Sequence, residues 1–296
     1  MRTTDTPGPT GTTAAHSHAQ LPLQQALPPR APASHRRRGA PGRPARLPTT
    51  LVVTLLGAIG VSPQLAHADE RRFTYVYEST VHAPGEIAYE QFITWKTDRE
   101  DRPGFNRLDL RHEFEFGVVE DFQIGLYLPD WRIEWDDASS SVRFRDVAVD
   151  GVLALTNPSE APIGSALYGE VKVGDELFVL EGKLLLQVNV DRTVFAWNGI
   201  VEAEWEGDGY DDDKGVFGQT FGVSYEISPR WLVGAELVHE VEYAGWSDWG
   251  DHFVAVGPNV SHRREQFWIT ATALLQVTDL ANEPDFQLRT IVGFDF

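Results

Sequence analysis

The chain has 296 residues, a formal net charge of −19, no Cys and one Met. The absence of Cys excludes a disulfide framework and thiolate metal sites, and the acidity argues against a nucleic-acid-binding protein, which needs a basic surface. The mean hydropathy of −0.27 argues against a bundle of transmembrane helices. It leaves a transmembrane β-barrel open, because only half of the residues in a barrel strand are apolar.

The first part of the chain has the features of an export signal. Residues 1–50 contain no Phe, Tyr or Trp, so they cannot bury enough apolar surface to offset the entropy of ordering. A basic run precedes the apolar segment 47–61, and Ala66 and Ala68 follow with the small-x-small spacing of a cleavage site. This order of basic, apolar and small residues predicts a secretory signal peptide.

The predicted cleavage divides the chain into two parts. Residues 1–68 are expected to be a disordered n-region plus signal peptide, removed on export, and residues 69–296 a single barrel domain. Every Trp, Tyr and Phe falls in the second part. An exported, Cys-free, acidic and aromatic-rich chain indicates the envelope of a bacterium with two membranes.

Residues 69–296 alternate between apolar and polar side chains with a period of two, as half-buried β-strands do. Leu108 and Leu110, for example, alternate with Asp109 and Arg111. We find no helical spacing. The alternation predicts twelve strands, at 85–97, 105–118, 122–135, 142–156, 163–174, 177–191, 193–206, 215–227, 230–243, 251–263, 266–278 and 285–296.

One face of these strands carries no charged residue, so it must meet something apolar. The apolar face belongs either to a soluble β-sandwich or to the lipid-facing wall of a barrel. Aromatic residues near both ends of the strands, longer acidic connections on one side and an even strand number favour the barrel. The predicted fold class is therefore all-β, a transmembrane antiparallel up-and-down barrel of about twelve strands in the outer membrane. The alternative is a secreted soluble β-sandwich binding module with a carbohydrate-like ligand.

The chain ends in an alternating apolar strand that finishes with Phe294 and Phe296. This ending resembles the C-terminal signal of bacterial outer-membrane β-barrels, and the resemblance implies recognition by the barrel-assembly machinery. Segments 108–117 and 122–128 loosely resemble uncharacterised barrels grouped with phenol-degradation-pathway outer-membrane proteins. That second resemblance implies no particular substrate.

The sequence offers no convincing catalytic or metal-binding set. Asp211, Asp212 and Asp213 together with His252 could imitate the mouth of an outer-membrane protease, but a run of charges in a loop is usually a solvated surface. The same acidic run lacks the spaced ligands of an EF-hand. We therefore predict no catalytic residue, no cofactor and no metal site.

Two ladders of glutamates form the strongest cluster in the predicted lumen. The strands at 193–206 and 230–243 run in the same direction, and small residues lie on the strand between them. The ladders indicate either simple solvation of the lumen or a vestibule that attracts cations. The predicted vestibule residues are Glu202, Glu204, Glu206, Glu236, Glu240 and Glu242.

The predicted role is passive: a pore or transporter for small solutes, cation-preferring if open, or a structural envelope protein. The expected partners are outer-membrane lipid, the assembly machinery and a small cationic or aromatic solute, with no nucleic acid. Trp246 and Trp249 could stack on such a solute or anchor the barrel at the interface.

Overall fold

The computed structural model describes residues 71–296, so the predicted signal peptide and its cleavage residues Ala66 and Ala68 lie outside the described residues. Within 71–296 no helix is long and apolar enough to cross a membrane. The strands are β1 (Ile87–Arg99), β2 (Arg102–Val119), β3 (Phe122–Tyr127), β4 (Trp131–Trp135), β5 (Ser140–Phe144), β6 (Asp146–Thr156), β7 (Gly164–Gly174), β8 (Leu177–Val190), β9 (Thr193–Glu206), β10 (Asp212–Ser228), β11 (Trp231–Ala244), β12 (Asp248–Arg264), β13 (Phe267–Gln276) and β14 (Phe286–Asp295).

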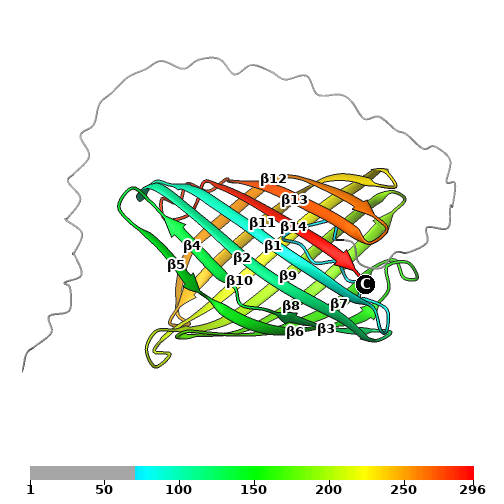
Figure 1. The fold of residues 1–296 in the computed structure, drawn as a ribbon, viewed down its shortest axis with the longest axis horizontal. Helices are drawn as coiled ribbons and strands as arrows, with labels where there is room; N and C mark the ends of the chain where they lie inside the picture. The colour runs from blue at the N-terminus through cyan, green and yellow to red at the C-terminus, as the bar shows by residue number, and fades with distance from the viewer. Residues whose placement is uncertain (1–70) are drawn as a thin grey trace, which may run out of the picture. The chain divides into compact units, whose positions relative to one another are not determined.

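The strands form one closed antiparallel barrel, shown in Figure 1. Consecutive strands pair from β6 through β14, and β14 closes the barrel on β1 from Ala88 opposite Asp295 to Thr97 opposite Phe286. β1 pairs in turn with β2. Closure removes the exposed sheet edges that an open sheet would leave. The predicted all-β transmembrane barrel is confirmed, and the β-sandwich alternative is excluded.

Fourteen strand segments make twelve barrel strands, because two of the predicted strands are interrupted. The predicted strand 122–135 is divided into β3 and β4 at Pro129, which has no N–H to donate to the sheet. β2 pairs with β3 through its second half and with β4 through its first half. The neighbouring strand is interrupted at Arg145, which separates β5 from β6.

The outer face of the barrel carries the apolar phase of every strand. On β10, for example, Phe217, Phe221 and Tyr225 are exposed, whereas Thr220 and Ser224 on the opposite phase are buried. Exposed Leu, Val and aromatic side chains recur on the strands around the barrel. A surface of this kind is unfavourable in water and fits the hydrocarbon core of a bilayer.

Outward aromatic side chains lie near both ends of the barrel, as predicted. We call the end where β1 begins and β14 finishes the terminal end, and the other the opposite end. Trp231 and Tyr225 are exposed near the terminal end, and Trp95 and Phe217 near the opposite end. Such aromatic bands lie at the two interfaces of a membrane barrel.

The contrast in connection length is weaker than predicted. Segments 97–104 and 244–251, which join consecutive predicted strands and were among the acidic connections expected to be long, are mostly hairpin, because β2 begins at Arg102 and β12 at Asp248. The prediction was wrong there because acidic residues are compatible with a loop and equally with an exposed strand that extends beyond the membrane. The long connection 277–285 does lie at the opposite end.

The C-terminal residue completes the closing strand pair. The Phe296 N–H donates to the Ile87 carbonyl at 2.9 Å, and the Phe296 side chain is 76% exposed. Phe294 also points outward, with its ring centroid 5.2 Å from that of Phe267. The two phenyl groups of the predicted assembly signal are therefore presented on the outer surface, at the terminal end.

We expect deletion of Phe296 to reduce insertion into the outer membrane, because it removes the terminal aromatic group and one hydrogen bond of the closing pair. The measurement is the amount of heat-modifiable barrel in isolated outer membranes. Phe286→Ala is the matched control, since it removes an outward phenyl group from the other end of the same strand. Equal insertion of the deletion and the wild type would contradict the predicted assembly role.

Candidate channel lumen and its N-terminal segment

A segment that precedes the first strand lies inside the barrel. We call residues 71–82 the lumen segment. Phe73, Val76, Ser79 and His82 are each no more than 2% exposed, although none belongs to a strand. The segment contacts side chains on the inner wall from β2 and β3 round to β13. Most of its wall contacts lie in the half of the lumen nearest the terminal end, and the Tyr75 side chain reaches toward the opposite end, where its hydroxyl donates to Gln287.

Glu236 is the main anchor of the lumen segment. Its carboxylate accepts the backbone N–H groups of Thr74 at 2.9 Å, Tyr75 at 2.7 Å and Val76 at 3.1 Å. It also accepts the Thr272 hydroxyl. A carboxylate that receives several N–H groups satisfies donors that would otherwise be buried without a partner.

Uncharged amide side chains on the wall bind the rest of the segment backbone. Asn198 accepts the Tyr77 N–H at 2.7 Å and donates to the Tyr77 carbonyl at 2.9 Å. Gln187 accepts the Ser79 N–H at 2.9 Å. At the end of the segment, Gln123 accepts the His82 N–H. At its start, Asn259 donates to the Arg72 carbonyl. These contacts replace the ladder of a sheet, since the segment pairs with no strand.

Apolar side chains of the segment pack on apolar patches of the inner wall. Phe73 and Val76 pack with Val194 and Ala196. Farther round, Tyr77 and Val81 pack on a patch of Val152, Ala166, Tyr168 and Leu185, and Tyr75 packs on a patch of Val238, Phe253, Ala255 and Leu274. The lumen is consequently not uniformly polar, because these patches of the inner wall form a core with the segment.

Cations on the wall lie over the segment's tyrosine rings. The Lys183 ammonium is 4.2 Å from the Tyr77 ring centroid, and the Arg289 guanidinium is 4.1 Å from that of Tyr75. Both distances fit cation–π contacts. Burial raises the pKa of Tyr75 to about 12, although Arg289 opposes the shift. Tyr75 therefore remains a neutral phenol in the lumen.

A cavity lies between the lumen segment and the terminal end of the barrel. It has a volume of about 1020 Å³. The segment contributes Arg72 and residues 78–81 to its lining, and most of the remaining lining comes from the connections between strands at this end. The segment thus separates this cavity from the other half of the lumen.

The predicted vestibule glutamates do not all lie in one place. Glu202, Glu204 and Glu206 are on the inward phase of β9, and Glu240 and Glu242 are on that of β11. Glu236 lies deeper, only 1% exposed, and is engaged by the lumen segment. The opposite half of the lumen therefore contains five of the six predicted residues.

Two lysines pair with part of this acidic group. The Lys172 ammonium lies 3.1 Å from Glu202, and the Lys214 ammonium lies 3.3 Å from Glu204 and 3.5 Å from Glu242. Within residues 71–296, Glu240 makes no ion pair shorter than 4 Å, and it is exposed although it faces inward. Its exposure indicates that this half of the lumen is open to water.

The loop residues singled out from the sequence have local partners. The Trp246 indole N–H donates to Asp213 at 2.7 Å, and the Trp249 ring lies 3.8 Å from that of Tyr243. Both tryptophans are more than half exposed. The His252 ring is hydrogen-bonded to His239 at 2.8 Å, on the outer face of the barrel.

The sequence reasoning missed the lumen segment. Its signal was present in Phe73, Tyr75 and Tyr77, which alternate with Thr74 and Val76 in a stretch too close to β1 to form another strand of the wall. A second signal was the set of inward uncharged amides, because a buried amide requires hydrogen-bond partners.

Comparisons with known proteins agree with the fold. The sequence pattern described as "Family of unknown function (DUF6662)" matches residues 179–285. No curated protein matches the chain. The COG4313 outer membrane channel from Pseudomonas putida F1 is structurally similar, with a TM-score of 0.53 and 10% identity over 73% of this chain and 97% of that chain. A NanC porin aligns with a TM-score of 0.49 and 8% identity over 70% of this chain and 98% of that chain.

Proposed function

We propose that the protein is an outer-membrane channel for small solutes that prefers cations, and that the lumen segment occludes it in the state described here. The observation that carries the proposal is the division of the lumen. One half holds five inward glutamates and includes the exposed Glu240, and residues 71–82 lie across the lumen between that half and the cavity at the terminal end. A passive channel needs no catalytic group, and the lumen chemistry described above is that of binding rather than catalysis.

The proposed cation preference follows from charge. Lys172 and Lys214 partly neutralise Glu202 and Glu204. Glu206 and Glu240 add further negative charge to the same half of the lumen. A group of carboxylates in a narrow lumen concentrates cations and repels anions. The solute that fits this chemistry is small and cationic, and its passage requires the lumen segment to move, because the segment lies across its path.

The test is the reversal potential across a planar bilayer under a salt gradient. We expect the wild type to be cation-selective and a Glu202→Gln, Glu204→Gln, Glu240→Gln variant to lose most of that selectivity. The preference should weaken with salt, because the Debye length falls to ~3 Å at 1 M. Glu226→Gln is the matched control, since Glu226 faces the lumen near the terminal end and is paired with Arg263 at 2.7 Å. An anion-selective pore, or unchanged selectivity of the triple variant, would refute the proposed vestibule.

A further inference from the structure

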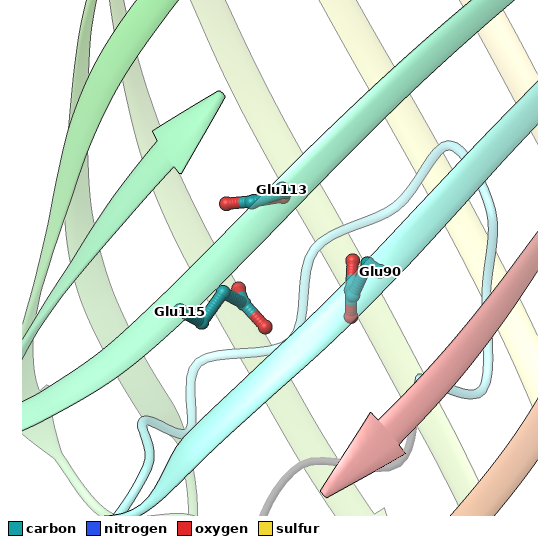
Figure 2. Close-up of side chains that lie close together, drawn as sticks. All are labelled: Glu90, Glu113 and Glu115. Carbon is teal, nitrogen blue, oxygen red and sulfur yellow. The ribbon is translucent and has the colours of Figure 1, made fainter. Parts of the chain in front are cut away.

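Three glutamates come together on the inner wall beside the start of the lumen segment. Glu90 lies on β1, and Glu113 and Glu115 lie on β2 (Figure 2). One carboxylate oxygen from each lies within 4.8 Å of the others, and the three side chains are no more than 3% exposed. Glu90 and Glu113 are direct partners across the two strands. Like charges in that position destabilise a sheet unless a cation lies between them.

The cation now at this site belongs to the lumen segment. The Arg71 guanidinium lies 2.7 Å from Glu90, 3.1 Å from Glu115 and 3.6 Å from Glu113. Burial opposes its charge, but the carboxylates of Glu90 and Glu115 raise the pKa of Arg71 well above its ordinary value. The site therefore already binds a positive group, supplied by the chain itself.

Arg71 lies farther from Glu113 than from the other two carboxylates. His82 Nε2 lies 3.3 Å from Glu115 and adds a charge only when it is protonated. A fourth acid, Asp150 on β6, lies close by, since a Cβ on Gly125 would meet both its carboxylate and that of Glu113 within 2.5 Å. Among residues 71–296, the acids of the cluster thus outnumber the cationic side chains beside them.

Glu113 is the carboxylate of the cluster with the fewest contacts to donors. Its side chain is 0% exposed, and within residues 71–296 neither of its carboxylate oxygens accepts a hydrogen bond. A buried carboxylate without hydrogen bonds is costly unless a cation lies against it. Hard divalent cations take carboxylate oxygens as ligands, and Ca²⁺ accepts them in flexible geometry at about 2.3–2.6 Å.

We propose that Glu90, Glu113 and Glu115 form a divalent-cation site in the lumen, and that the cation competes with the guanidinium of Arg71 for the same carboxylates. In the structure described here the Arg71 guanidinium lies against these carboxylates. Since Arg71 begins the lumen segment, a cation that takes its place would weaken the attachment of that end of the segment. The cation and the segment would thereby oppose each other, and by linkage each would lower the affinity of the other for the wall.

The test is Tb³⁺ luminescence of the folded barrel in detergent, with Ca²⁺ as competitor. Tyr77 can sensitise the emission, because its ring lies 4.5 Å from the Arg71 guanidinium. We expect Arg71→Gln to tighten Tb³⁺ and Ca²⁺ binding roughly tenfold or more, about the effect of one lost competing contact. Adding Glu113→Gln to that variant should remove the tightened binding, whereas adding Glu226→Gln should not.

Each variant is first checked for heat-modifiable migration, which reports the folded barrel independently of any ion. Arg71→Lys keeps the positive charge and should bind Tb³⁺ as weakly as the wild type. Should Glu113→Gln not fold, Glu113→Asp, which keeps the charge but shortens the reach, should lower the affinity instead. Equal affinity of Arg71→Gln and the wild type would overturn the competition. Equal affinity with and without Glu113→Gln would overturn the site, and neither readout depends on whether the barrel conducts.

Discussion

Leu184→Arg should destabilise the barrel by ~2–4 kcal/mol, the cost of placing Arg on the lipid face near the bilayer midplane. Leu184 is 40% exposed on the outer face near the middle of β8, opposite Leu167 on β7 and Gly199 on β9. Neither of these cross-strand partners is an acid that could pair with the new guanidinium. The measurement is the free energy of unfolding in phospholipid vesicles, from a guanidinium titration followed by Trp fluorescence.

The adjacent residue provides the control. Lys183 faces the lumen and is paired with Glu181 at 2.8 Å, so Lys183→Arg keeps a charge that already has a partner and should lower the free energy of unfolding less than Leu184→Arg does. The same side chain is thus placed on the two faces of one strand, one residue apart. If both variants were equally stable, β8 would not face lipid as described.

The outer face was predictable because lipid imposes a single requirement on every outward residue. A charge there is costly whichever strand carries it, so the period of two extends through all twelve strands, and their positions follow from local sequence alone. The interruption at Pro129 was also open to prediction, since a proline inside a strand removes one donor. The strand ends were less predictable, because beyond the membrane acidic residues fit both loops and extended hairpins.

The lumen was much less predictable because its inner residues meet a distant part of the chain. Glu236 looks like its neighbours Glu240 and Glu242 in the sequence, yet it binds the backbone of Thr74, 162 residues earlier. Likewise Leu185 and Leu232 are inward apolar residues that a water-filled pore would not need. Alternation separates inside from outside, but it cannot tell an inner residue that meets water from one that meets the lumen segment.

Glu236→Ala should release the lumen segment and raise the conductance of the barrel. The substitution leaves the N–H groups of Thr74, Tyr75 and Val76 without their acceptor. Each buried donor that loses its partner costs ~1–3 kcal/mol, so the bound state of the segment loses several kcal/mol relative to a solvated one. The packing of Phe73 and the contacts of Asn198 remain, so the expected result is frequent opening rather than permanent loss of the segment from the lumen.

Release can be measured apart from conductance, because the chain contains no Cys and a single introduced thiol is unambiguous. Ser79 is 1% exposed, so Ser79→Cys should react slowly with a water-soluble thiol reagent in the otherwise wild-type barrel. Adding Glu236→Ala should speed the reaction at least tenfold, and adding Glu240→Ala, on the same face of β11, should not. Slow labelling in the Glu236→Ala background would show that this carboxylate does not hold the segment. Fast labelling without a rise in conductance would instead place the barrier to solutes elsewhere in the lumen.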